Sequence, residues 1–278
     1  MNNDFLNIVN QETFNRISNL ELIGTGGQKM VYSGTDSTFG EIVLKFIELH
    51  TESTIKRALR ELEIAARLEG KEYPKLHKYD YIEVGEKSYL YVIEEKIEGS
   101  TLRCYLNKNE KVPVERAVDI GVSLLKGLIK VHNNKLVHRD IKPENIIINN
   151  DRLVLLDFGI ARDLAADSLT ADLAMFGPMT IGYAAPEQIK NQKKIICNRT
   201  DLFSWAIIIY ELIRGYNPLI KDAKNREEVI QNTLNKDIPS LNSGNSILDI
   251  VIGKCLEKAV HRRPSSGEYL IEMLRGIE

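Results

Sequence analysis

Hydrophobic and polar positions in roughly the first hundred residues are arranged mainly as in short β-strands. A glycine cluster at residues 24–27 interrupts this arrangement, and residues 54–68 change to the apolar spacing of an amphipathic helix. We expect strands at residues 22–23, 30–32, 42–44, 79–84 and 88–94, with a hairpin turn at 85–87. The pattern predicts a small β-rich region that contains one helix.

Beyond Gly99 the apolar spacing is mostly helical. Residues 114–133 form a long amphipathic segment directly after Pro113, and residues 201–214 form a strongly apolar one. Three further helical patterns cover residues 225–235, 245–257 and 265–275. At the other end of the chain, residues 4–18 have loosely helical apolar spacing, which suggests a short packed extension.

These patterns divide the chain into three parts. We expect an N-terminal extension at residues 1–19, a β-rich lobe at 20–96 and a larger helical lobe at 97–278, joined near residues 95–99. A cleft between two lobes is the usual place for a ligand, so we expect a binding site there.

Composition narrows the classes of function. The chain has 278 residues, of which 43% are hydrophobic, enough for a substantial core. Its net charge of −2 would not attract nucleic acid or an anionic membrane electrostatically. The three cysteines, Cys104, Cys197 and Cys255, have no metal-ligand spacing, which indicates reduced thiols. No signal-peptide pattern opens the chain and residues 206–213 are too short to span a bilayer, so we expect a cytoplasmic protein with no membrane segment and no nucleic-acid partner.

One short loop, residues 138–145, places an acid, a base and an amide close together. Asp140 can accept the proton of an attacking hydroxyl, and Lys142 can neutralise charge on a phosphoryl group in transfer. The amide oxygen of Asn145 and the carboxylate of Asp157 are ligands of the kind that Mg²⁺ favours. These groups together predict a site for phosphoryl transfer.

The run His138-Arg139-Asp140 with Lys142 and Asn145, followed by Asp157-Phe158-Gly159, resembles the catalytic and metal loops of protein kinases. The resemblance covers about residues 20–277. Lys142 favours the serine/threonine type, and the short connections resemble the eukaryotic-like kinases of bacteria. His138 and Phe158 are expected to be packing residues.

The resemblance implies an α+β, two-lobed protein-kinase fold with an ATP cleft between a small β-rich lobe and a larger helical lobe. It also implies transfer of the γ-phosphoryl group of ATP to serine or threonine hydroxyls of a protein substrate, the chain itself included. Mg²⁺ is the expected metal, with Mn²⁺ as a substitute, and the expected role is signalling by protein phosphorylation.

By the same resemblance, Gly24, Gly26 and Val31 belong to the glycine-rich loop that covers the ATP phosphates. Lys29 stands at the place of the third glycine, which is a departure from the family pattern. Taken alone, a glycine cluster between two strands is also typical of a plain turn.

Lys45 follows the apolar run at 42–44, where the family has the lysine that holds the α- and β-phosphates. That lysine pairs with a glutamate of the following helix, and we prefer Glu61 to its neighbour Glu63 for this role. Without the resemblance, Lys45 reads as the solvated end of a strand.

Residues 91–102 resemble the hinge that binds adenine through the main chain, with Glu95 and Ile97 as the contacting residues. Glu94 stands at the gatekeeper position, which is usually apolar or threonine. A carboxylate there needs a partner or water, because burying it alone is costly.

Residues 157–187 resemble an activation loop that ends in Ala185-Pro186-Glu187. Thr180 matches the threonine that lies beside Asp140 and Lys142 in the family. Arg139 and Arg162 are candidates for a phosphate-binding pocket. The usual phosphorylation position is occupied by Phe176, so the remaining loop candidates are Ser168 and Thr170.

Two later residues extend the resemblance. Asp201 matches the aspartate that braces the catalytic loop, and Arg263 matches the arginine that pairs with Glu187. Each alone would read as a helix-cap carboxylate or a surface cation.

Two alternatives to a protein kinase stay open. A small-molecule phosphotransferase shares the catalytic loop but generally lacks Thr180, Glu187 and the Arg263 partner. A non-enzymatic scaffold would need a defect outside the intact catalytic set, such as Lys29 or Glu94 preventing nucleotide binding.

Overall fold

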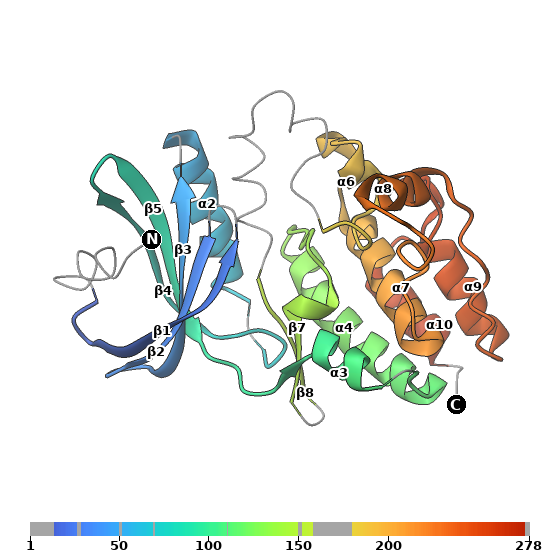
Figure 1. The fold of residues 1–278 in the computed structure, drawn as a ribbon, viewed down its shortest axis with the longest axis horizontal. Coiled ribbons are helices and arrows are strands. Elements are labelled where there is room, and N and C mark those ends of the chain that lie inside the picture. The colour runs from blue at the N-terminus through green and yellow to red at the C-terminus, as the bar shows by residue number, and fades with distance from the viewer. Residues whose placement is uncertain are drawn as a thin grey trace. The chain divides into compact units, whose positions relative to one another are not determined.

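The structure, a computed structural model, describes residues 14–26, 29–49, 52–68, 70–109, 111–149, 152–157 and 180–275. These residues fall into two compact units (Figure 1). The first contains the described residues up to Leu68 together with Pro74–Ile97. The second contains Gly70–Tyr73 and the described residues from Glu98 onward.

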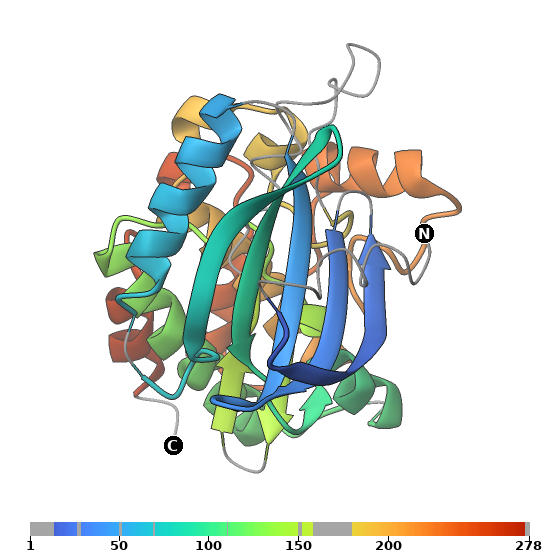
Figure 2. The same cartoon turned by 90° about the vertical axis from the view of Figure 1, so that its left-hand side faces the viewer.

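The first unit is built on an antiparallel sheet with the strand order β1-β2-β3-β5-β4. Its strands are β1 (Ile17–Gly26), β2 (Lys29–Asp36), β3 (Gly40–Leu49), β4 (Leu76–Val84) and β5 (Lys87–Glu95). Helix α2 (Glu52–Ala65) contacts β4 and lies beside the sheet (Figure 2). The predicted strands all fall within β1 to β5, and the predicted helix is confirmed as α2, which ends at Ala65 and not at Leu68. Gly85, with a φ of 64°, forms the expected turn between β4 and β5.

The prediction that a strand ends at Lys45 is wrong. β3 continues to Leu49, and Lys45 is paired with Val31 of β2 on one side and with Val92 of β5 on the other. Lys45 is only 7% exposed, so it is a buried residue of a central strand and not a solvated strand end. The apolar run 42–44 continues through Phe46 and Ile47, which are buried as well.

Aromatic residues form a large part of the core of the first unit, beside aliphatic ones such as Ile42 and Leu44. The ring of Phe14 packs edge-on against Phe46 and Tyr91, with centroid distances of 5.7 and 5.0 Å. Tyr32 packs edge-on against Phe46 in turn. Such edge-to-face pairs add to the stabilisation that the buried area supplies. Within the predicted extension, Phe14 and Ile17 are packed into this core, and the residues from Ile17 onward already belong to β1.

The second unit is mainly helical. Its helices are α3 (Leu102–Lys108), α4 (Val114–Asn133), α6 (Pro186–Ile189), α7 (Asn198–Arg214), α8 (Arg226–Asn235), α9 (Ser246–Cys255) and α10 (Gly267–Leu274), and its 3₁₀ turns are η1 (Pro143–Asn145), η2 (Lys193–Ile195) and η3 (Val260–Arg262). The predicted helices are all confirmed. The segment at 114–133 matches to the residue, and α7 begins three residues before the predicted Asp201 because its first turn is polar.

A small antiparallel sheet also belongs to the second unit. It consists of β6 (Ser100–Thr101), β7 (Ile146–Asn149) and β8 (Arg152–Leu155), and β7 and β8 flank the segments that carry Asn145 and Asp157. The sequence patterns missed these strands because each has at most four residues, too few to show a period.

Helix α7 is buried from Thr200 to Ile213, as expected for a helix that is apolar on every side. It lies close to α4 at Gly121, whose carbonyl accepts a hydrogen bond of 2.9 Å from the indole of Trp205. A Cβ at position 121 would lie 2.9 Å from the side chain of Ile209, so glycine permits this approach. None of the described helices combines the length and apolar character that a membrane crossing requires.

Candidate active site

The backbone of the loop at residues 138–145 is held by the carboxylate of Asp201, in the first turn of α7. Its two oxygens accept hydrogen bonds of 2.8 Å from the N–H groups of His138 and Arg139. The Nε2 atom of His132 lies 2.9 Å from one of them. Burial alone would raise the pKa of Asp201, but the contact with His132 and the other donors hold it below its usual value. The charged carboxylate therefore fixes the loop, in which Arg139 adopts a left-handed φ of 66°.

Three side chains meet at the carboxylate of Asp140. The hydroxyl of Thr180 donates to Oδ1 at 2.9 Å, and the ammonium of Lys142 lies 3.1 Å from Oδ2. Lys142 also donates to the Thr180 hydroxyl at 3.0 Å, and the amide of Asn145 donates to Oδ2 at 3.0 Å. The structure thus brings a cation, an amide and an alcohol within hydrogen-bond distance of one acid, Asp140.

Asn145 and Asp157 are candidates for a metal site. The Nδ2 atom of Asn145 is used by Asp140, and its Oδ1 is the atom of that amide suited to a cation. The N–H of Leu156 donates to the carbonyl of Asn145 at 2.8 Å, which ties Asp157 to the end of the catalytic loop. Within the described ranges no three His, Cys, Asp or Glu residues gather as a metal cage. Two oxygen ligands suit Mg²⁺, which completes its shell with water and substrate phosphates.

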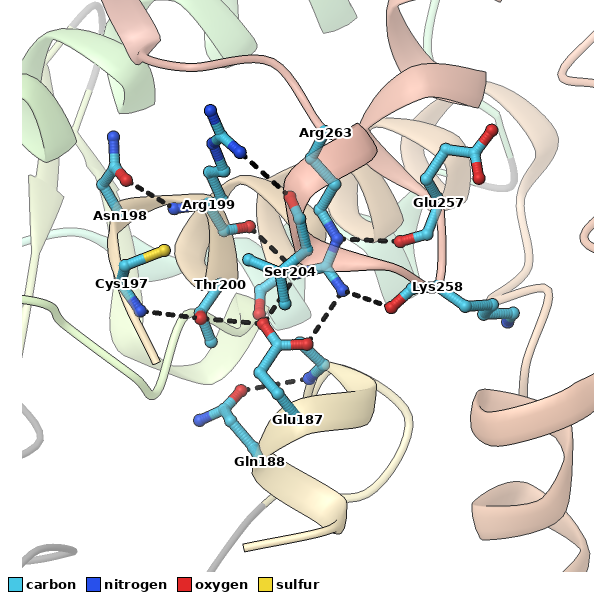
Figure 3. Close-up of polar contacts among 12 residues, drawn as sticks. Glu187, Gln188, Cys197, Asn198, Arg199, Thr200, Ser204, Glu257, Lys258 and Arg263 are labelled. Atoms are coloured by element: carbon cyan, nitrogen blue, oxygen red, sulfur yellow. Dashed lines mark hydrogen bonds and ion pairs between the residues drawn. The ribbon is translucent and has the colours of Figure 1, made fainter. Parts of the chain in front are cut away.

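Glu187 and Arg263 form a buried ion pair in two parallel hydrogen bonds (Figure 3). The distances are 2.7 and 2.8 Å, and the two side chains are at most 1% exposed. Thr200 donates to the same carboxylate at 2.8 Å. The guanidinium also donates to three carbonyls, those of Arg199, Glu257 and Lys258. The pair therefore joins α6 to α7 and to the segment before η3.

Gln188, which the sequence patterns did not single out, connects α6 with the catalytic loop. Its amide nitrogen donates to the carbonyl of Arg139 at 2.8 Å, and its amide oxygen accepts from the N–H of Ala185 at 3.0 Å. The sequence shows that a glutamine directly follows the Ala-Pro-Glu motif. It does not show the hydrogen-bond partner, the carbonyl of Arg139, which lies 49 positions away.

A second cluster that the sequence patterns missed surrounds Arg103 of α3. Its guanidinium bonds to Glu144 of the catalytic loop and to Glu211 of α7, both at 2.8 Å, and to the hydroxyl of Tyr183. The Tyr183 hydroxyl in turn bonds to Glu211. Burial, and after it the charge of Glu211, raises the pKa of Tyr183, so the hydroxyl remains a donor. The cluster anchors the chain three residues beyond Thr180 to the loop that carries Asp140.

In the first unit, the side chain of Lys45 forms an ion pair with Glu94. The two side chains are 9% and 14% exposed, and they come from the neighbouring strands β3 and β5. The partner that a gatekeeper carboxylate requires is therefore Lys45. Glu61 lies on α2, but its side chain is outside the described residues, as is any contact that it makes with Lys45.

The glycine-rich segment forms the β1–β2 hairpin. Gly24 is paired with Val31, and Gly26 is paired with Lys29. Lys29 is thus the first residue of β2. The tip of the hairpin, residues 27–28, is outside the described residues.

The expected hinge begins within β5, whose last residue is Glu95. The N–H of Glu95 donates to the carbonyl of Lys75 at 2.8 Å, so this N–H is already bonded within the first unit. The side chain of Glu95 accepts from the N–H of Lys75 at 3.1 Å. Ile97 is half-buried in the segment after the strand.

Several expected residues of the loop at 157–187 lie outside the described residues. They are Phe158, Gly159, Arg162, Ser168, Thr170 and Phe176. His138 is described and is 1% exposed, with Nε2 placed 3.0 Å from the carbonyl of Leu156. Burial lowers the pKa of His138, so a neutral, packed imidazole is expected there.

Comparison with known proteins gives the same family. The family model described as "Protein kinase domain" matches residues 17–273 of this chain. The probable serine/threonine-protein kinase PknB of Lactococcus lactis is 29% identical over 90% of this chain and 40% of its own length. The serine/threonine-protein kinase PknL of Mycobacterium tuberculosis is 33% identical over 78% of this chain and 53% of its own. The serine/threonine-protein kinase PrkC of Bacillus subtilis is 27% identical over 92% of this chain and 39% of its own.

The chain thus spans between about two fifths and half of the length of these curated relatives. The family description covers most of the described residues of both units, including β1 to β5 and the helices up to α10. The chain belongs to the protein kinase family, and the three relatives named above are bacterial proteins described as serine/threonine-protein kinases, the first of them as a probable one.

Proposed function

We propose that this protein is an ATP-dependent serine/threonine protein kinase that transfers the γ-phosphoryl group of ATP to hydroxyls of proteins, itself included. We further propose that residues 20–96 and 97–278 are the two lobes of one kinase domain, preceded by an extension at 1–19. The observation that carries the proposal is the position of Thr180. Its alcohol oxygen makes the contacts with Asp140 and Lys142 that an acceptor hydroxyl would need.

Each residue of that cluster has a chemical task. Asp140 orients the acceptor hydroxyl and takes its proton as the oxygen attacks in line. Lys142 stabilises the charge that develops on the phosphoryl oxygens. Asn145 and Asp157 would hold Mg²⁺, or Mn²⁺ in its place, which when bound neutralises charge on the β- and γ-phosphates. Asp201 acts through the loop backbone and keeps Asp140 in position.

The first unit supplies the nucleotide-binding residues. Lys45 binds the α- and β-phosphates with Glu61 as its helix partner, and the β1–β2 hairpin covers them through Gly24, Gly26 and Val31. Glu95, through its carbonyl, and Ile97 bind adenine. Glycines suit a hairpin that must bring main-chain N–H groups close to phosphate oxygens.

A protein substrate is favoured over a small molecule by the segment from Thr180 to Glu187. The Glu187–Arg263 pair and the Arg103 cluster hold this segment against the catalytic loop, where an extended polypeptide could lie beside it. We propose that Ser168 or Thr170 carries regulatory phosphate, with Arg139 and Arg162 as its binding partners. Cytoplasmic signalling is the setting that we propose.

The test is incubation with radiolabelled ATP and Mg²⁺, with a generic protein and the chain itself as acceptors. Asp140→Ala should lower transfer by about 100- to 10,000-fold, the range for loss of a general base, and Asp157→Asn should abolish it. Asp119→Asn, an exposed aspartate of α4, is the matched control and should leave transfer unchanged. Undiminished labelling by Asp140→Ala would refute the proposal, and absence of label from every variant would favour the scaffold.

A further inference from the structure

Lys45 and Glu94 meet because of the register in which β3 and β5 pair. Lys45 stands opposite Val92, and Glu94 stands opposite Val43, so the two charged residues are diagonal neighbours on the ladder. Residues two apart on a strand point to the same face of a sheet, and diagonal neighbours are within reach of long side chains. The register therefore brings the ammonium and the carboxylate together on one face.

Both charges of this pair are largely buried. The side chains of Lys45 and Glu94 are 9% and 14% exposed. Removing one partner of a buried ion pair leaves the other charge without compensation. β3 and β5 are both interior strands of the sheet, so each backbone is hydrogen-bonded on two sides. The backbone of Glu94 therefore stays in place relative to Lys45, and its carboxylate is a fixed counterion.

A fixed counterion matters to a lysine that binds phosphate. A lysine side chain loses considerable rotamer entropy when it is ordered, and preorganisation reduces this cost at the moment of binding. An ammonium group has three N–H donors, so Lys45 can bond to Glu94 and to a phosphate oxygen at the same time.

Resting on the proposed function, in which Lys45 binds the ATP phosphates, we propose that Glu94 is the positioning residue for Lys45. It holds the ammonium ready for the α- and β-phosphates from within the sheet, in addition to any contact from Glu61 on α2. Glu94 therefore acts on the phosphate part of the nucleotide through Lys45, and not on the adenosine part.

The test measures the affinities of MgATP and of adenosine separately, by calorimetry, for the wild type and Glu94→Gln. This change keeps the size of the side chain and removes its charge. We expect MgATP to bind about ten- to a hundredfold more weakly, as for loss of one charge-assisted hydrogen bond, and adenosine affinity to be unchanged. Glu94→Asp keeps the charge but shortens the side chain, so its MgATP affinity should be intermediate.

Glu48→Gln is the matched control. Glu48 of β3 pairs with Lys87 of β5 at 2.8 Å, so this variant loses an ion pair between the same two strands at a different place. Both affinities should remain at the wild-type values. Should Glu94→Gln not fold, the comparison of Glu94→Asp with Glu48→Gln decides the question in the same way.

Unchanged or tighter MgATP binding by the Glu94 variant would overturn the proposal, because Glu94 would then either not act on Lys45 or withhold it from phosphate. Equal losses for MgATP and adenosine would overturn it too, since they indicate general damage to the unit. Lys45→Met separates this idea from the proposed function. If Lys45→Met leaves MgATP affinity unchanged, the role of Lys45 itself fails; if only Lys45→Met weakens it, the positioning role of Glu94 alone fails.

Discussion

Replacing Arg263 tests how strongly one buried ion pair stabilises the helical unit. The guanidinium and the carboxylate of Glu187 are at most 1% exposed and are joined by bonds of 2.7 and 2.8 Å. Removing one partner of such a pair costs roughly 3–5 kcal/mol, because the remaining charge stays buried without compensation. That is a large share of the about 5–15 kcal/mol by which a typical domain is stable.

Arg263→Leu should lie at the upper end of this range because it also removes the hydrogen bonds to three carbonyls. Glu187→Gln should cost less, since an amide oxygen can still accept one guanidinium N–H. Unfolding in urea can be followed by the fluorescence of Trp205, the single tryptophan, which is buried in α7. In a thermal scan the same loss corresponds to a Tm lowered by about 6–20 °C.

Glu257→Gln is the control for this experiment. Its contact with Arg262 is long, at 3.9 Å, and Arg262 is 67% exposed, so we expect a change below about 0.5 kcal/mol. If Arg263→Leu were no less stable than this control, the reasoning from burial and bidentate geometry would be refuted.

Two further predictions concern the catalytic loop. Thr180→Ala should lower kcat/KM by roughly tenfold, because the hydroxyl contacts with Asp140 and Lys142 are lost, and Thr180→Ser should restore it. Steady-state kinetics of Thr180→Ala equal to those of the wild type would contradict a catalytic effect of these contacts. The pKa of Asp201 is lowered in the folded protein, so its stabilisation is present above the unfolded value of about 3.9 and is lost as the pH falls through the lower folded value. Urea midpoints measured from about pH 6 downward should therefore fall less steeply for Asp201→Asn than for the wild type, and equal slopes would contradict this.

Local sequence patterns are sufficient for the helices and for the catalytic loop. The helix at 114–133 is predicted to the residue because Pro113 precedes a regular amphipathic pattern. Asp140, Lys142 and Asn145 stand within a few residues of one another, so their proximity is already given by the chain. Strand ends are less certain, as Lys45 shows: a single charged residue in an apolar run looks like a boundary unless its neighbours on both sides are known.

By itself, the sequence determined the family, the helical segments and the groups available for phosphoryl transfer, because these depend on residues that are near one another along the chain. Apart from the pair of Glu187 and Arg263, which the resemblance already implied, the tertiary structure decided which distant charges meet. The pairing of β3 with β5 places Glu94 beside Lys45, and the packing of α3 against the catalytic loop places Arg103 beside Glu144. The physical reason is that strand register and burial, rather than separation in sequence, determine which charges must compensate one another.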